Sequence, residues 1–305
     1  EAARRAQCGN NLKQQGLGLH QYHAQHNRFP AGARIHTGDD NELGISWCVE
    51  VLPYLELVNM YNEISPDSKG GADNWNPAQQ IVDVFVCPSA NPQSSSATTL
   101  KVSNYSTVAG AGRKPDDVKD LEDNLCGDVY TDGAFYPGSE TRTSEIGDGT
   151  SKTLAIGERT YIFREWMFGS SKAGGVPPKR ICSGSSHNIR YPLNANPLEL
   201  EDGFYKFDNA APVGAIKKML LNDLFFGSEH PGGAQFNFAD GSVHMFRDDT
   251  SPVKDLLGHM RKLAPAAKFT VCGPCHETSF PVKPTLAGAW DVFAQEVLPG
   301  SNEAG

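Results

Sequence analysis

A stripe of mostly apolar positions runs at helical spacing through the first 29 residues of the chain. Its successive members are four, three, four, three and four residues apart, and they are Cys8, Leu12, Gln15, Leu19, Tyr22 and His26. This spacing places them on one face of an α-helix, with charged and amide side chains largely on the other faces. The pattern therefore predicts one continuous helix over residues 1–28 that packs along this stripe.

Two features of this helix point beyond the segment itself. Gly16 and Gly18 each cost a helix about 1 kcal/mol relative to alanine, so the helix requires a partner surface along its stripe. The helical pattern is already running at Glu1, and we expect the helix to continue upstream of that residue.

Alternating apolar and polar residues predict β-strands farther along the chain. Such segments lie near residues 81–87, 101–109 and 153–163. The clearest signal is a hairpin over residues 234–246, in which two alternating strands flank an Asp240-Gly241 turn. We expect these strands to form an antiparallel sheet that faces Cys8, Leu12, Leu19 and Tyr22 of the N-terminal helix.

Three further segments have weaker patterns. Pro53 divides the apolar residues 45–64 into a strand-like part and a short helix over residues 54–64. Residues 169–215 are rich in Gly, Pro, Ser and Asn, which predicts a long insertion with little regular structure. Residues 250–263 have the spacing of a short amphipathic helix.

Composition narrows the possible classes of function. Of the 305 residues, 39% are hydrophobic and 21% are charged, and the 31 Gly and 20 Pro indicate a loop-rich globular protein with much β-structure. The net charge of −9 argues against a nucleic-acid-binding surface. No apolar run reaches the roughly 18 residues of a membrane span, so we expect any targeting or anchoring segment to lie upstream of residue 1.

The seven cysteines favour an oxidising compartment, the periplasm or the cell exterior. Two of them are clustered, at Cys272 and Cys275. The scattered ones lack metal-site spacing, and the odd total leaves at least one unpaired in any scheme of disulfides alone. The scattered cysteines are Cys8, Cys48, Cys87, Cys126 and Cys182.

Several sequence blocks, taken together, resemble a known protein family. His230, the nine residues PGGAQFNFA and then Asp240-Gly241 form one of them. Other blocks occur in order along residues 1–250, and they are EAARRAQCGNNLKQQGLGLHQYH, LPYLE, FVCPS, SNY, DGTSKTLAIGE and SGSSHN. With this set the chain resembles the prepilin-like proteins abundant in planctomycetes, whose C-terminal signature is a His, nine residues and Asp-Gly.

The resemblance implies an α+β fold like that of type IV pilins and type II secretion pseudopilins. A long N-terminal helix would pack on an antiparallel sheet that carries large loop insertions. Residues 1–250 would form this pilin-like domain, with residues 1–29 as its truncated spine helix and residues 169–215 as a loop insertion. Residues 251–305 would be a C-terminal extension outside the family pattern.

The resemblance also implies a role. The chain would be an exported structural subunit of a cell-surface filament or secretion apparatus in the cell envelope. Its partners would be further copies or other pilin-like subunits, bound through the N-terminal helix. An apolar half-helix upstream of Glu1 would anchor it in the membrane.

The motif residues His230, Asp240 and Gly241 are expected to be structural. An Asp-Gly hairpin turn needs a positive φ at the glycine and gives the aspartate a local backbone hydrogen bond. We expect His230 to brace this loop. The sequence contains no nucleophile-elbow or phosphate-loop motif, so we expect no enzymatic activity.

The C-terminal extension contains the sharpest local chemical signal. Cys272-x-x-Cys275-His276 has the spacing that attaches haem c, through two thioethers and an adjacent imidazole that ligates the iron. His259 is the first candidate for the sixth iron ligand, and Met260 is the second. A pilin scaffold that displays haem c for electron transfer is therefore an alternative function.

The same tail allows other interpretations. Cys272 and Cys275 could form a thioredoxin-type redox pair, although Pro281 and Pro284 argue against the helix that such a motif requires. They could also form a plain disulfide or half of a zinc site. A surface head that binds a glycan or another ligand through residues 169–215 is a further alternative.

Two other groups of polar residues suggest metal sites. Paired carboxylates could bind Ca²⁺ in loops, at Asp39-Asp40, Asp116-Asp117 and Asp248-Asp249. His20, His23 and His26 lie three residues apart on the N-terminal helix. Because Tyr22 and Gln25 lie between them, we interpret these histidines as part of a solvated or sheet-packed face rather than as metal ligands.

Overall fold

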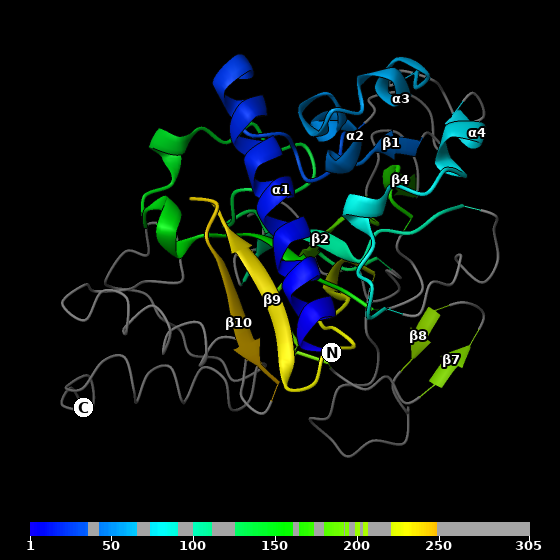
Figure 1. Ribbon diagram of the computed structural model, residues 1–305. Coiled ribbons are helices and arrows are strands. Elements are labelled where there is room, and N and C mark those ends of the chain that lie inside the picture. The colour runs from blue at the N-terminus through cyan, green and yellow to red at the C-terminus, as the bar shows by residue number, and fades with distance from the viewer. Residues whose placement is uncertain are drawn as a thin grey trace, which may run out of the picture.

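The long helix α1 (Ala2–His26) lies across a β-sheet in the computed structural model of the protein (Figure 1). The structure describes residues 1–35, 43–65, 74–90, 100–111, 126–160, 165–173, 180–191, 193–194, 199–201, 204–206 and 221–248. Over these residues the chain is an α+β protein. The continuous N-terminal helix predicted from the apolar stripe is confirmed, and it ends at His26.

Five strands form the sheet that α1 crosses. Their order is β10-β9-β3-β2-β6, and neighbours are antiparallel except for β2 and β6. The expectation of a purely antiparallel sheet is therefore wrong at one edge, where β6 runs in the same direction as β2. In chain order the strands are β2 (Tyr105–Gly110), β3 (Leu154–Glu158), β6 (Ser186–Asn188), β9 (Gly233–Phe238) and β10 (Val243–Arg247).

Three of the predicted strand regions are confirmed in this sheet. Residues 101–109 overlap β2, which continues to Gly110, and residues 153–163 contain β3, which ends at Glu158. The hairpin is β9 and β10, and Gly241 at its turn has a φ of 85°. Asp240 Oδ1 accepts the backbone N–H of Ser242 at 2.9 Å, which is the local hydrogen bond expected of this turn.

Residues 169–215 contain more regular structure than predicted. In a second, antiparallel sheet β4 (Phe168–Ala173) pairs with β1 (Leu43–Ile45) on one side and with β5 (Arg180–Ser183) on the other. A two-stranded pair, β7 (Glu199–Glu201) and β8 (Phe204–Lys206), follows. The expectation of little regular structure is wrong here. The composition of the segment predicts loops, but backbone hydrogen bonds to β1 and β2 hold parts of it as strands.

Short helices connect the strands. The strand expected in the first part of residues 45–64 is instead α2 (Trp47–Val51), because Ser46 Oγ accepts the N–H of Cys48 at 3.1 Å and caps a helix. The helix predicted over residues 54–64 is divided at Glu56, which has a φ of 62°. In the described part of the chain the other helical segments are η1 (Leu52–Leu55), α3 (Val58–Asn62), α4 (Trp75–Ala78), η3 (Asp83–Phe85), η4 (Thr143–Glu145), η5 (Thr150–Lys152) and η6 (Leu221–Asp223).

The strand predicted near residues 81–87 does not form, and η3 occupies its centre. The carbonyl of Val84 accepts a hydrogen bond from Gln15 Nε2 at 2.6 Å, and the carbonyl of Val86 accepts one from Asn11 Nδ2 at 3.0 Å. This segment therefore bonds to side chains of α1 instead of to a neighbouring strand. The prediction of a strand is wrong, because alternation along the sequence does not show that side chains of α1 bind these carbonyls in place of a neighbouring strand.

The stripe of α1 is buried as predicted from Cys8 to Tyr22, whereas His26 at its end is exposed. Cys8, Leu12 and Leu19 have at most 2% of their surface exposed, and Tyr22 has 8%. The first three belong to a core that also contains Trp47 and other large side chains from the segments beside α1. Along its length α1 contacts β9, β10 and β3 of the sheet and η1, α2 and η3 at its flank.

Two glycines allow α1 to approach β9 closely. A Cβ added at Gly9 would lie 2.7 Å from Gln235 Oε1, and one at Gly16 would lie 2.5 Å from Asn237 Nδ2. Both distances are shorter than van der Waals contact. The two glycines lie two helical turns apart and share the face that meets β9. The propensity cost of Gly16 is therefore offset by a close approach that a larger residue would prevent.

We predict that Gly16→Ala destabilises the protein, although alanine is the better helix former. The gain in helix propensity is about 1 kcal/mol. Overpacking a tight contact costs about 1–3 kcal/mol, so we expect a net loss of up to ~2 kcal/mol. Urea unfolding followed by circular dichroism measures it. Lys13→Ala, at an exposed position of α1, is the control; a Gly16→Ala variant at least as stable as wild type would contradict the close approach.

A histidine is buried on the edge strand β6. His187 is fully buried, and its Nδ1–H donates to the carbonyl of Leu221 at 3.1 Å. Its Nε2 lies 3.4 Å from Arg159 Nη1 and accepts from that guanidinium. Burial, together with the charge of Arg159, holds the pKa of His187 well below its usual range.

We predict that His187 contributes to loss of stability at acid pH. Its folded-state pKa is depressed, so its contribution is present above the unfolded-state pKa of about 6.5 and is lost as pH falls below it. The melting temperature of the wild type should therefore fall more between about pH 7.5 and 5.5 than that of His187→Gln, which cannot titrate. Equal pH dependence in the two proteins would refute this assignment.

Candidate functional site

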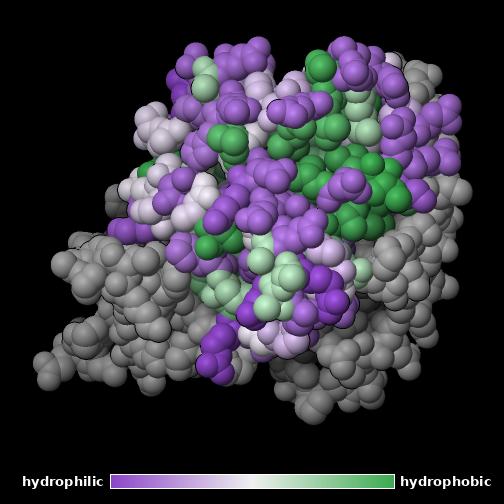
Figure 2. All heavy atoms as spheres, in the orientation of Figure 1, coloured by the Kyte–Doolittle hydropathy of each residue, from purple (hydrophilic) through white to green (hydrophobic). Residues whose placement is uncertain are grey.

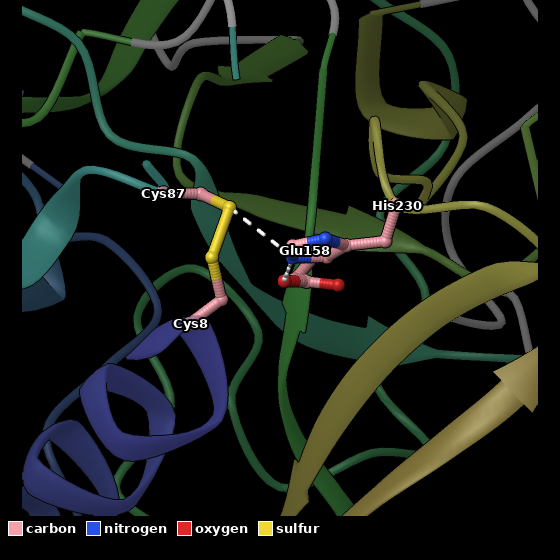
Figure 3. A group of neighbouring side chains, drawn as sticks. All are labelled: Cys8, Cys87, Glu158 and His230. Atoms are coloured by element: carbon pink, nitrogen blue, oxygen red, sulfur yellow. Dashed lines mark hydrogen bonds and ion pairs between the residues drawn. A yellow bond between two sulfur atoms is a disulfide. The ribbon is translucent and has the colours of Figure 1, made fainter. Parts of the chain in front are cut away.

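Four side chains from separate segments meet near the N-terminal end of α1 (Figure 3). Cys8 comes from α1, Cys87 follows η3, Glu158 ends β3, and His230 precedes β9. All four are buried, and one potential ligand atom from each lies within 4.8 Å of the others. We refer to these four residues as the Cys8 cluster.

Cys8 and Cys87 form a disulfide that ties α1 to the segment beside it, with a Cα–Cα distance of 5.3 Å. Hydrogen bonds to the backbone at and next to Cys87 fix the segment that carries this cysteine. Asn104 Oδ1 accepts the backbone N–H of Cys87 at 2.9 Å, and Asn11 of α1 donates to the adjacent carbonyl of Val86. The disulfide therefore joins two segments that side-chain amides already place in contact.

His230 connects the disulfide with two carboxylates. Its Nδ1 lies 2.6 Å from Glu1 Oε1, and its Nε2 lies 3.4 Å from Cys87 Sγ and 3.4 Å from Glu158 Oε1. Burial opposes a charged imidazole, but the carboxylates of Glu158 and Glu1 outweigh it and raise the pKa of His230. The hydrogen bond from His230 lowers the pKa of Glu1 to about 2.

Glu158 directs one oxygen into the cluster. Only 1% of its surface is exposed. Its Oε2 accepts the backbone N–H of Gln235 at 2.7 Å, which fixes the carboxylate against β9. Its Oε1 is buried, has no hydrogen-bond partner and faces His230 Nε2. A buried acceptor without a hydrogen-bond donor is costly, and the charge that this oxygen faces is that of His230 when its ring is protonated.

The chemistry available to the cluster depends on the state of the two sulfurs. Joined as a disulfide, they provide a covalent connection between helix and sheet. As thiolates, together with one imidazole and one carboxylate, they would present the kinds of ligand atom that proteins use for zinc. Among the residues that the structure describes, these side chains form a group close enough to hold one metal ion.

The sequence-predicted motif is divided between the two ends of the hairpin. His230 lies in the Cys8 cluster, near the start of β9, whereas Asp240 and Gly241 form the turn at its other end. The expectation that His230 braces the turn is therefore wrong. The ring of His20, on α1, lies beside that turn instead: its Nε2 would be 3.6 Å from a Cβ at Gly241.

Sequence reasoning did not group Cys8, Cys87 and Glu158 with His230. Each of the four lies in a different block of the family resemblance: the opening segment, FVCPS, DGTSKTLAIGE and the histidine motif. That shared membership is the signal that could have grouped them. Their separation along the chain hid the relation, since Cys8 and Cys87 are 79 residues apart.

The remaining cysteines in the described part of the chain are accounted for. Cys126 and Cys182 form a second disulfide, with a Cα–Cα distance of 5.0 Å. Cys48 is an unpaired, buried thiol, and burial raises its pKa to about 12. Its thiol is therefore protonated at neutral pH and chemically inert.

The haem c prediction lies outside the described residues. This applies to Cys272, Cys275 and His276 and to the proposed sixth ligands, His259 and Met260.

The other candidate metal sites are only partly described. Of the acidic pairs, the residues outside the described part are Asp39, Asp40, Asp116, Asp117 and Asp249. Asp248 accepts a hydrogen bond from Asn194 Nδ2 at 3.1 Å. The three histidines of α1 contact neighbouring side chains: His20 packs edge-on to Phe29, His23 bonds Thr143, and His26 bonds Tyr54.

We predict that Cys87→Ser lowers stability by about 2–5 kcal/mol, because it removes a disulfide that closes a long loop. It should also expose α1 to trypsin at Arg5 and Lys13, since the helix loses its covalent tie. Urea unfolding and limited proteolysis with mass spectrometry measure these effects. Cys182→Ser is the matched control, and it should destabilise the protein without opening α1. Equal trypsin resistance of α1 in Cys87→Ser and wild type would argue against the tie.

Comparison with known proteins gives one family relation. The sequence profile of a family described as a protein of unknown function, DUF1559, matches residues 1–252. No curated protein and no solved structure matches the chain. Among the residues described, neither α1 nor any other helix combines the length and apolarity needed to cross a membrane.

Proposed function

We propose that this chain, which belongs to the DUF1559 family of proteins of unknown function, is an exported, pilin-like structural subunit. The observation that carries the proposal is α1, a 25-residue helix packed along the β9 side of a mainly antiparallel sheet. A spine helix laid on such a sheet is the arrangement that the prepilin-like resemblance implies. The histidine motif of that resemblance contributes His230 to the contact between helix and sheet.

An envelope or extracellular location follows as part of the proposal. Two disulfides among the described residues, Cys8–Cys87 and Cys126–Cys182, favour an oxidising compartment. In the proposed subunit α1 is the distal half of a longer spine, and an apolar half-helix before Glu1 anchors it in the membrane. Sequencing the upstream coding region tests the anchor, which requires a stretch of ~20 apolar residues.

The surface beside α1 supports contact between subunits. Figure 2 shows polar atoms along the outer face of α1 and a hydrophobic area next to them. Among the described residues the large hydrophobic side chains that are exposed are Leu17 of α1, Val58 of α3 and Ile81, with 56%, 48% and 61% of their surface exposed. A contiguous exposed apolar area, such as the one in Figure 2, is typical of protein contact sites. We propose that neighbouring subunits cover it in the assembly.

The proposal is tested with the full-length precursor expressed in its own cells. We expect the protein in the envelope fraction, and antibody labelling in electron micrographs should locate it in filaments or envelope complexes. Recovery of the full-length protein solely as a monomer in the cytosol would overturn the proposal.

We predict that Leu17→Gln weakens assembly whereas Lys13→Gln does not. The two positions are one helical turn apart on exposed α1 surface, so they form a matched pair. Burying a leucine contributes about 1.5–3 kcal/mol, which corresponds to roughly ten-fold or more in association. Sedimentation of purified assemblies against subunit concentration measures the effect. Identical concentration dependence in both variants would remove Leu17 from the contact.

A second candidate function is electron transfer through a haem c bound at the C-terminal extension. The observation in its favour is the Cys272-x-x-Cys275-His276 sequence. The visible spectrum and intact mass of the native protein test it. A Soret band that is lost in Cys272→Ala would support covalent haem; a colourless native protein without added mass would exclude it and leave the structural role unaffected.

A further inference from the structure

The orientation of His230 in the Cys8 cluster is that of a metal-binding histidine. Its Nδ1–H donates to Glu1 at 2.6 Å, so the lone pair of its neutral form lies on Nε2. That nitrogen points to Cys87 Sγ and Glu158 Oε1, each 3.4 Å away (Figure 3). Metal-ligating histidines in proteins commonly donate their other ring N–H to a carboxylate, which fixes the tautomer and the ring. In this protein Glu1 is that carboxylate.

The spacing of the four potential ligand atoms fits one small ion. Zinc bonds of about 2.0–2.3 Å in a tetrahedron hold ligand atoms roughly 3.3–3.8 Å apart. The imidazole nitrogen is already 3.4 Å from one sulfur and from one carboxylate oxygen, and all four atoms lie within 4.8 Å of one another. Side-chain adjustments of about an ångström would complete the tetrahedron once the two sulfurs are separate.

We propose that the Cys8 cluster binds Zn²⁺ when its disulfide is reduced. Cys8 and Cys87 would supply two thiolates, His230 the imidazole Nε2, and Glu158 the Oε1 that has no hydrogen-bond partner in the disulfide form. Two sulfurs, a nitrogen and an oxygen in a buried, closed position favour zinc, a tetrahedral ion without redox chemistry of its own, over the hard cations Ca²⁺ and Mg²⁺.

The two states of the cluster exclude each other. A dithiol reductant transfers two electrons to the Cys8–Cys87 bond, which becomes two thiols, while the reductant becomes a cyclic disulfide. Zinc binding then displaces the two thiol protons to solvent and forms two Zn–S bonds. Oxidation of the thiolates by a disulfide reagent reverses the sequence and releases the ion.

Zinc would preserve the connection that the disulfide makes. Both ligation and oxidation join Cys8 of α1 to Cys87, and the zinc form would add Glu158 of β3 and His230 before β9. Helix and sheet would therefore stay attached in a reducing environment as well as in an oxidising one. This property goes beyond the proposed structural role, and it holds whether or not the protein assembles.

The test uses the complete chain carrying Cys272→Ser and Cys275→Ser, because those two cysteines are themselves a potential ligand pair. The protein is reduced, freed of reductant without air, and titrated with Co²⁺ as a coloured substitute for zinc. We expect thiolate charge-transfer and tetrahedral ligand-field bands that saturate at one ion per chain and disappear on addition of Zn²⁺. The oxidised protein should show none of these bands.

Variants assign the ion to the cluster. Cys87→Ser and His230→Gln should weaken Co²⁺ binding at least about ten-fold, while Cys182→Ser, in the second disulfide, should leave it unchanged. His230→Gln can still form the Cys8–Cys87 bond, so its fold is verified by circular dichroism in the oxidised state before reduction. Zinc should also restore trypsin resistance of α1 in the reduced protein.

Either of two results would overturn the proposal. One is a reduced chain that binds no Co²⁺ or Zn²⁺. The other is binding that persists in Cys87→Ser and His230→Gln but is lost in Cys182→Ser, which would place the ion elsewhere. Neither result bears on the structural role, because that role rests on the disulfide form and on assembly.

Discussion

The connection of α1 to the sheet at Cys8 is the constraint on which the rest of the structure depends. A 25-residue helix that contains several glycines is marginal on its own, and most of its stability must come from packing. The disulfide to Cys87 and the ion pair of Glu1 with His230 fix its beginning. At its end, the N–H of Phe29 donates to Thr141 at 2.8 Å, and His23 bonds Thr143. Between these points the apolar stripe closes the core.

Polar side chains set the position of α1 as much as apolar ones do. Asn11 donates to the carbonyl of residue 86 and Gln15 to that of residue 84. Gln235 of β9 donates to the carbonyl of Arg5 at 2.9 Å. The bonds to residues 84 and 86 pair backbone carbonyls of a segment that belongs to no strand. They also fix the rotation of α1 about its axis and its position along that axis, which hydrophobic contact alone would define less well. The same placement brings Gly16 against Asn237 and Cys8 against Cys87.

Features of the fold that arise from local pattern could be predicted from the sequence, and features that arise from distant partners could not. The spacing from Cys8 to Tyr22 specifies a helix and its buried face, and Asp240-Gly241 specifies a turn, because in each case the deciding interactions lie within a few residues. The segment around Val84 alternates like a strand, yet side chains of α1 bind its carbonyls. For the candidate site, His230 was recognised, but its partners come from residues 8, 87 and 158 of the chain, and no local spacing indicates such a set.

Disulfide mapping of the native protein tests the central connection most directly. Digestion without reduction, followed by mass spectrometry, should yield a peptide containing Cys8 joined to one containing Cys87. A second joined pair should contain Cys126 and Cys182, and Cys48 should be recovered as an unmodified thiol after denaturation. Cys8 joined to any other cysteine would contradict the proposed attachment of the helix to the sheet.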